Sequence, residues 1–178
     1  MEISSVSRTQ RKSLRWAGFD YSAPGVYFIT ICTTSRRPLF AHVDDTGRLH
    51  PSPIGRSVSE LWDDLPNRFP QVELIAFIAM PDHVHGVLAI LPDAGAAKPP
   101  PTLGRIVSVL KSTTTHHTRA LRASGGLSGP LWQQGFHDRV VRSDDELRQI
   151  EGYIQENPVR WASLRISSEH EESNDGLA

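Results

Sequence analysis

Two histidines, His83 and His85, lie one residue apart in the otherwise apolar segment IAMPDHVHGVLAIL (78–91). Alternate residues of a strand point to the same side, so both imidazoles face one way while Val84 faces the other. Two imidazoles placed like this can bind one metal ion, each through one ring nitrogen. A pair of polar residues at a sheet surface is the alternative, because a usable metal site needs at least a third ligand.

A tyrosine and an asparagine are spaced so that they can complete such a site. Tyr153 and Asn157 lie four residues apart in the segment DDELRQIEGYIQENP (144–158). On a helix they differ by roughly 40° around the axis and project from one side. The apolar face of that helix consists of Leu147, Ile150 and Ile154. Tyr153 and Asn157 flank this face, where they can line a cleft between helix and sheet.

A tyrosine beside a metal ion indicates chemistry on a phosphodiester. The cation polarises the phosphate, and the phenolic oxygen attacks phosphorus. The amide oxygen of Asn157 is then a candidate third ligand. Taken singly, each residue also has a structural explanation, Tyr153 at the edge of a core and Asn157 at the end of a helix.

Two basic regions are candidates for contact with a polyanion. A predicted helix that starts at Leu103 carries hydroxyl and basic side chains on its polar side: Ser108, Lys111, Thr115, Arg119 and Arg122. The N-terminal arm, residues 1–20, carries four basic residues: Arg8, Arg11, Lys12 and Arg15. Glu2 is its one acid before Asp20, the last residue of the arm. Both patterns suit contact with DNA phosphates. A solvated helix face and a solvated tail have the same composition.

The last eleven residues differ in charge from the rest of the chain. They contain four acids and no Lys or Arg, and removing these charges from the net charge of −1 leaves +3 for residues 1–167. We expect an acidic, disordered tail at 167–178. Residues 21–166 are then one domain between this tail and the basic arm.

The composition is that of an ordinary globular protein. The chain has 178 residues, of which 38% are hydrophobic and 22% charged, enough for one domain with a substantial core. We find no apolar run that could cross a bilayer and no secretory signal, so no membrane partner is expected. The lone cysteine, Cys32, lies in an apolar run and favours a core role and a reducing cytoplasm.

The elements that must position these residues follow from the hydrophobic pattern. We expect strands at 25–34, 72–80 and 83–91, a small hairpin around the Asp-Asp-Thr-Gly turn (44–47), and a helix from Ile54 that ends at Pro66. A helix from Leu103 keeps its apolar face as far as Leu121, and a loop (123–130) and a strand (136–142) follow. The last helix runs from Asp144, after a Ser143 cap, to Asn157, because Pro158 disfavours helical geometry before it.

This order predicts the fold class. It is α+β: a ferredoxin-like antiparallel sheet of order βαββαβ, with an inserted small hairpin and an extra C-terminal helix that carries the tyrosine.

The segments that hold the candidate residues resemble a known family. MPDHVHGVL (80–88) resembles the His-hydrophobic-His strand of the HUH single-strand DNA endonucleases. LWQQGFHDRVVRSDDELRQIEGYIQENPVRW (131–161) is similar to the C-terminal block of their single-tyrosine branch, above all the REP-associated tyrosine transposases. The similarity runs from about residue 25 to residue 161.

The resemblance implies an activity and roles for four residues. His83 and His85 would hold a divalent ion, Mg²⁺ or Mn²⁺, with Asn157 as the third ligand. Tyr153 would attack a DNA phosphate, giving a 5′-phosphotyrosine link and a free 3′-hydroxyl. The substrate would be single-stranded DNA with a foldable hairpin near the cleavage site. Relatives include monomers and homodimers.

Two other functions remain open at this point. One is a domesticated protein that does not mobilise DNA, or a non-catalytic module that only binds hairpin DNA. The other is a metal-dependent phosphohydrolase of small molecules, which would release free product and form no tyrosine adduct.

Overall fold

The computed structural model describes residues 24–92 and 100–174. Their elements, in chain order, are β1 (Gly25–Cys32), the 3-10 turn η1 (Thr34–Arg36), β2 (Ala41–Val43), β3 (Leu49–Pro51), α1 (Pro53–Asp63), α2 (Leu65–Arg68), β4 (Val72–Ala79), β5 (His83–Ile90), α3 (Leu103–His117), α4 (Arg119–Ser124), β6 (His137–Val141) and α5 (Asp144–Asn174). The predicted strands, the hairpin and the Ser143 cap of the last helix are confirmed.

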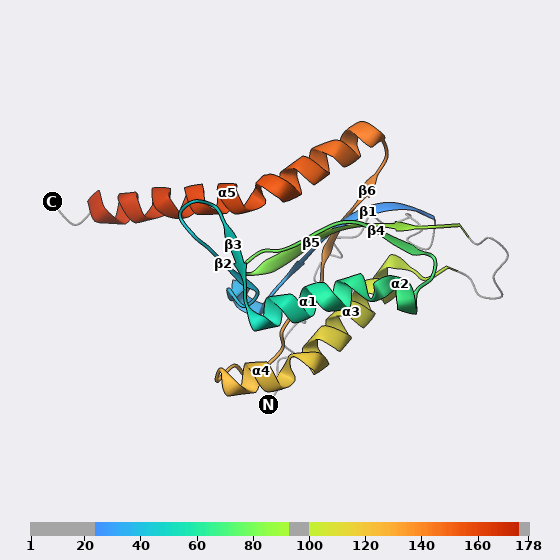
Figure 1. Cartoon of the computed structure of the whole chain (residues 1–178), viewed down its shortest axis with the longest axis horizontal. Coiled ribbons are helices and arrows are strands. Elements are labelled where there is room, and N and C mark those ends of the chain that lie inside the picture. The colour runs from blue at the N-terminus through green and yellow to red at the C-terminus, as the bar shows by residue number, and fades with distance from the viewer. Residues whose placement is uncertain (1–23, 93–99, 175–178) are drawn as a thin grey trace, which may run out of the picture.

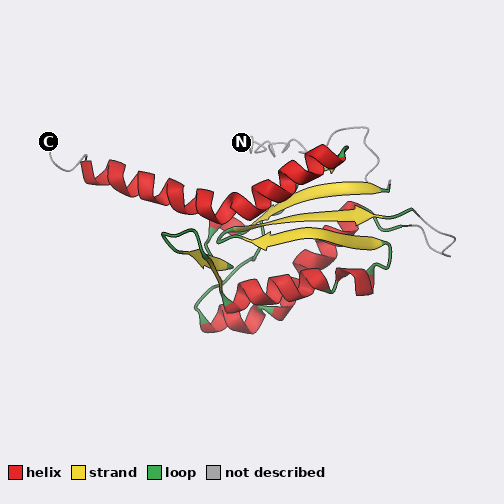
Figure 2. Ribbon diagram, turned by 45° about the horizontal axis from the view of Figure 1, so that its top comes forward, coloured by secondary structure: helices red, strands yellow, loops and turns green. Residues whose placement is uncertain are grey.

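Four strands form one antiparallel sheet in the order β4-β5-β1-β6. With α1 and α3 between the strands in sequence, this is the predicted ferredoxin-like arrangement, and the fold class is confirmed. Helices α1 and α3 cover one face of the sheet, and α5 crosses the other (Figures 1 and 2). The candidate catalytic tyrosine therefore lies on the face opposite the two crossover helices.

Strand β5 is buried along its whole length, and its side chains alternate between two cores. Val84 and Leu88 belong to the larger core under α1 and α3, whereas Val87 packs under α5 with Ile150 and Ile154. His83, His85 and Val87 occupy alternate positions of the strand, so the two histidines point to the same side as Val87, towards α5. The apolar face predicted for the last helix is thereby confirmed.

The β2–β3 hairpin extends from the sheet to α5. Gly47, in the hairpin turn, has φ +80 and lies so close to Val159 that a Cβ there would be 2.8 Å from that side chain. Val43 of the hairpin joins Met80 and Ala162 in a second small core. These contacts fix the middle of α5, at Val159 and Ala162, against the rest of the fold.

The single helix expected from Leu103 through Leu121 is wrong. It divides at Thr118 into α3 and α4, and Leu121 is 41% exposed. The break follows a run of threonines. The hydroxyls of Thr114 and Thr115 donate hydrogen bonds to the backbone carbonyls four residues earlier. β-branched residues with such bonds are poor helix formers and bend helices.

The predicted end of the last helix at Asn157 is also wrong. Helix α5 continues through Pro158 to Asn174, so residues 167–174 are helical rather than irregular, and 175–178 lie outside the described residues. A proline inside a helix removes one hydrogen bond and bends the axis, and α5 changes direction between its orange and red segments (Figure 1). The packing of Val159 and Ala162 on the hairpin offsets the cost of the proline.

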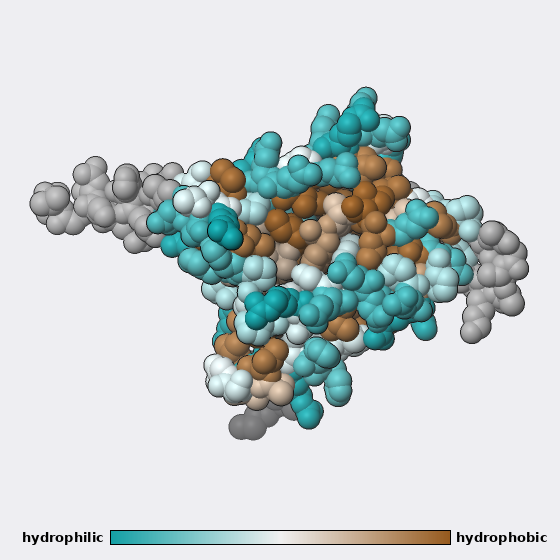
Figure 3. Space-filling view, viewed as in Figure 1, coloured by the Kyte–Doolittle hydropathy of each residue, from teal (hydrophilic) through white to brown (hydrophobic). Residues whose placement is uncertain are grey.

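Strand β4 forms one edge of the sheet. Its middle residues, Leu74 to Ile78, are only partly buried, and an apolar band lies between α5 and α1 on this side of the molecule (Figure 3). Whether the chain is a monomer or a homodimer stays a prediction. None of the described helices is long and apolar enough to span a membrane.

Candidate active site

His83 and His85 converge on one point under α5. Their Nε2 atoms lie 3.1 Å apart, and the two residues are 6% and 4% exposed. The alternation of the strand brings both rings to the same side, as the sequence predicts. Two ring nitrogens are thus aimed at one small volume.

The other nitrogen of each ring already has a partner. Nδ1 of His83 lies 2.6 Å from the carboxylate of Asp82, and Nδ1 of His85 lies 2.8 Å from the Thr30 hydroxyl. A carboxylate only accepts, so Nδ1 of His83 carries a hydrogen and donates it. In the neutral ring the lone pair is then on Nε2, where it faces His85.

Burial keeps His85 in the neutral form that can bind a metal. Desolvation, aided by the neighbouring His83, lowers the pKa of His85 from 6.5 to about 3. An imidazole binds a cation only through an unprotonated nitrogen. His85 is therefore available as a ligand at neutral pH.

An arginine supports this arrangement from the end of β1. Nε of Arg36 donates to the second Asp82 oxygen at 2.7 Å, and its Nη1 donates to the Cys32 sulfur at 2.8 Å. Ser35 and Arg36 have φ values of 57 and 53, a region that residues other than glycine rarely adopt. The turn at η1 thus places a guanidinium behind the carboxylate that orients His83.

Tyr153 reaches the same place from α5. Its hydroxyl lies 3.4 Å from Nε2 of His85, and its ring packs edge-on against Phe28 with centroids 6.3 Å apart. The guanidinium of Arg160 lies 5.8 Å from the centre of the tyrosine ring. Tyr153 is 39% exposed, so its side chain lies at the boundary between His85 and solvent.

Asn157 lies between two residues that contact the histidines. Tyr153, Asn157 and Trp161 follow one another at intervals of four, so they share a side of α5. The first is against His85, and the last is against His83 with ring centroids 6.0 Å apart. Asn157 is 7% exposed, and its amide makes no hydrogen bond within the described residues. The amide atoms themselves are not among the fully enclosed atoms without a partner in the described residues, so they keep contact with solvent and are accessible to a ligand.

These residues fit a divalent cation. Two neighbouring ligands of an octahedral ion with bonds of about 2.1 Å lie roughly 3.0 Å apart, close to the 3.1 Å between the imidazole nitrogens. Hydrogen bonds from the outer nitrogens, as to Asp82, are the usual support of metal-binding histidines. Among the described residues, this site included, no group of three or more His, Cys, Asp and Glu side chains is arranged to hold a metal, so a third protein ligand here would have to be of another type, such as the Asn157 amide.

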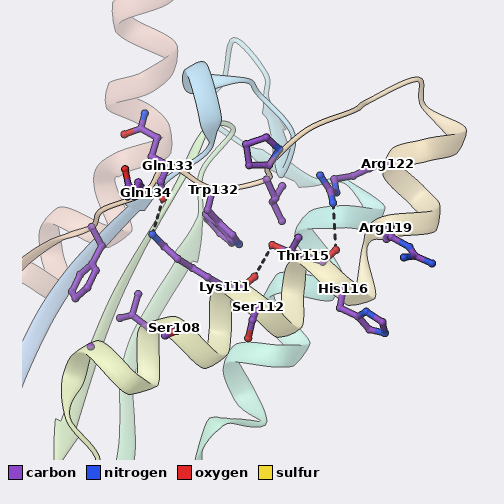
Figure 4. A pocket seen from close by; sticks show the side chains of 15 residues that line it. Ser108, Lys111, Ser112, Thr115, His116, Arg119, Arg122, Trp132, Gln133 and Gln134 are labelled. Atoms are coloured by element: carbon purple, nitrogen blue, oxygen red, sulfur yellow. Dashed lines mark hydrogen bonds between the residues drawn. The ribbon is translucent and has the colours of Figure 1, made fainter. Parts of the chain in front are cut away.

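The structure describes only three of the predicted DNA-binding residues, and it places them differently from the predicted arrangement. Arg8, Arg11, Lys12 and Arg15 lie outside the described residues. Lys111, Arg119 and Arg122 do not form an open stripe along one helix, because Arg122 is buried and belongs to α4. All three instead line one cavity between α3, α4 and the segment 130–136 (Figure 4).

Sequence reasoning missed Thr30, Asp82 and Arg36. Thr30 is the cross-strand partner of His85 in the β1–β5 pairing, so pairing the two predicted strands would have placed it beside the histidine. Asp82 precedes His83 directly, and a carboxylate next to a candidate ligand is a usable signal. Nothing local in the sequence marks Arg36, since its contact depends on the turn after β1.

Comparisons with known proteins agree with this fold. A family model of IS200-like transposases matches residues 26–157. The chain is 30% identical over 169 residues to an uncharacterized protein of Haemophilus influenzae, covering 85% of this chain and 89% of that one. A solved REP-associated tyrosine transposase bound to a REP hairpin superimposes with a TM-score of 0.54 at 21% identity, over 76% of this chain and 67% of that chain.

The ferredoxin-like sheet is the fold that this chain shares with the solved REP-associated tyrosine transposase. This chain belongs to the IS200-like transposase family. The resemblance seen in its sequence is confirmed.

Proposed function

We propose that this transposase nicks and rejoins single-stranded DNA that carries a hairpin, through a 5′-phosphotyrosine intermediate on Tyr153. The observation that carries the proposal is the position of the Tyr153 hydroxyl, 3.4 Å from a histidine nitrogen that itself lies 3.1 Å from its partner. A nucleophile and two candidate metal ligands converge there from distant parts of the chain.

A divalent ion, Mg²⁺ or Mn²⁺, would be held by His83, His85 and Asn157. When bound, it would neutralise charge on the phosphate under attack. Asp82 and Thr30 hold the two rings in place through their outer nitrogens. Phe28 fixes the tyrosine ring from the side.

The chemical step conserves the energy of the phosphodiester. The Tyr153 oxygen forms a bond to phosphorus as the bond from phosphorus to the 3′ oxygen breaks. The proton lost by the phenol is balanced by the one gained at the 3′-hydroxyl. Attack of a 3′-hydroxyl on the phosphotyrosine reverses the step and joins a strand without water or ATP.

The test is a covalent adduct with a labelled hairpin oligonucleotide and Mn²⁺, detected on a denaturing gel. We expect an adduct with the wild-type protein and none with Tyr153→Phe, which keeps the ring and its packing and should still bind the DNA. The matched control Tyr21→Phe, a tyrosine outside the described residues, should keep the adduct.

An adduct that persists in Tyr153→Phe would show that another residue is the nucleophile. Hairpin binding without Mn²⁺-dependent cleavage by the wild-type protein would instead favour the non-catalytic binding module. Turnover with free product and no adduct would favour the phosphohydrolase.

A further inference from the structure

A cavity of about 700 Å³ lies on the other side of the sheet from Tyr153, between α3, α4 and the segment 130–136 (Figure 4). Its size is that of a ligand pocket. Lys111, Arg119 and Arg122 line it together with His116, and its lining contains no Asp or Glu. The charge of the lining therefore suits an anion.

Arg122 is a buried cation without a counter-ion. It is 7% exposed, and its Nη1 and Nη2 donate to the carbonyls of Gly129 at 2.8 Å and Thr115 at 3.4 Å. Its Nε has no partner among the described residues. A buried charge is costly unless an opposite charge accompanies it. The partial negative charge of two carbonyl oxygens compensates the arginine only in part.

Lys111 is in a similar position. Its Nζ donates to the carbonyls of Gln133 at 2.8 Å and Gly135 at 2.6 Å, and burial lowers the pKa of Lys111 to about 8. Neither Lys111 nor Arg122 forms an ion pair within the described residues. Two partly or fully buried cations thus face one cavity with no carboxylate to neutralise them.

The cavity continues towards the candidate active site. A neighbouring hollow shares Gln134 and Phe136 with it and extends to Thr30 and His137. A third hollow of about 330 Å³ begins at Thr30 and His137 and ends at Tyr153. Thr30 is also the residue whose hydroxyl lies 2.8 Å from Nδ1 of His85, so the series of hollows reaches a direct neighbour of the histidine pair.

We propose that the Lys111–Arg119–Arg122 cavity binds a backbone phosphate of an unpaired DNA strand, and that the strand continues past Thr30 to Tyr153. This inference rests on the proposed function, since it names where the substrate of that site lies. A path that passes the start of β6, at His137, on its way to Tyr153 requires a flexible chain. A duplex, whose persistence length is about 150 base pairs, is too stiff for it, whereas a single strand follows such grooves by phosphate contacts and stacking.

The experiment measures binding of the full chain to a fluorescein-labelled, unpaired oligothymidine by anisotropy at several salt concentrations. Lys111→Gln and Arg119→Gln should each weaken binding about tenfold and reduce the salt slope by about 0.7. Arg105→Gln is the matched control, because Arg105 is exposed on α3, the helix that carries Lys111, and does not line the cavity. Arg119 is itself exposed, so its loss should not affect folding, which thermal denaturation checks.

Two outcomes would overturn the inference. One is an equal loss in Arg105→Gln, or no loss in the two cavity variants. The other is dTMP or inorganic phosphate displacing the labelled oligothymidine at concentrations comparable with an unlabelled oligothymidine, which would assign the cavity to a free phosphate compound.

The Tyr153 adduct is scored separately with saturating hairpin DNA. If the wild-type protein forms no adduct and the cavity variants still lose binding, the proposed function fails while the cavity assignment stands. If the adduct forms and the cavity variants bind normally, the cavity assignment alone fails.

Discussion

The carboxylate of Asp82 lies 2.6 Å from Nδ1 of His83 and decides which nitrogen of that imidazole is free. Because the carboxylate accepts the Nδ1 hydrogen, the neutral ring presents an unprotonated Nε2 to His85. Arg36 binds the second oxygen of the same carboxylate at 2.7 Å. A chain of charged and polar contacts thus runs from the turn after β1 to the candidate metal site.

Asp82→Asn should weaken Mn²⁺ binding by about 10- to 100-fold, the usual effect of losing such a supporting contact. His83 and Arg36 donate to different oxygens of Asp82, and in asparagine one of these two positions becomes an NH₂ group that would face a donor. Isothermal titration with Mn²⁺ measures the change. Asp64→Asn is the control, because Asp64 makes an exposed ion pair with Arg68 far from the histidines. Unchanged Mn²⁺ affinity in Asp82→Asn would remove this carboxylate from the site.

The burial of His85 predicts a dependence of stability on pH. Its pKa is about 3 in the folded chain against 6.5 ordinarily, so between these values the unfolded chain binds more protons than the folded one. Stability is therefore fully present above pH 6.5 and falls as the pH drops towards 3, by up to about 1.4 kcal/mol per pH unit.

Urea unfolding in EDTA, at intervals from pH 7 to pH 4, measures this effect. The difference in unfolding free energy between the wild-type chain and His85→Gln should shrink as the pH falls. The exposed His117, replaced by Gln, should leave the pH dependence unchanged. A difference that is constant with pH would mean that His85 is not buried as a neutral ring.

Gly86→Ala should destabilise the fold by about 1–3 kcal/mol, the range for overpacking a core. A Cβ there would lie 2.4 Å from the ring of Trp62, which is itself fully buried. Chemical denaturation measures the loss. Gly152→Ala is the control, since a Cβ at Gly152 meets nothing within 4 Å and alanine favours a helix. A wild-type stability for Gly86→Ala would show that Trp62 can move aside without cost.

Pro158→Ala should raise stability and lower activity at the same time. Alanine restores the missing helical hydrogen bond, worth roughly 1–3 kcal/mol, and removes the cause of the bend. A straighter helix moves Asn157 and Trp161 relative to the histidines, so adduct formation should fall. Melting temperature and the adduct assay measure the two effects, with the 72% exposed Leu164, replaced by Ala, as control. Full activity in Pro158→Ala would separate the bend from function.

Much of the fold could be read from local pattern. Strand β5 was predictable because apolar and histidine positions alternate, and the order of strands and helices then indicated the ferredoxin-like sheet. Two element boundaries were wrong for different reasons. Thr118 divides one expected helix because a run of threonines donates hydrogen bonds back to helix carbonyls. Pro158 fails to end another because the packing of Val159 and Ala162 on the hairpin outweighs the local effect of the proline.

The sequence by itself determined which residues share a side: His83 with His85, and Tyr153 with Asn157. The periods of strand and helix are properties of the local backbone, so spacing alone is sufficient for such pairs. The tertiary structure decided that these two pairs meet, with the Tyr153 oxygen 3.4 Å from His85. It also decided that Arg122 is buried and that Arg36 supports Asp82. These contacts join segments far apart in the chain, and only the packing of the sheet between its two layers of helix brings them together.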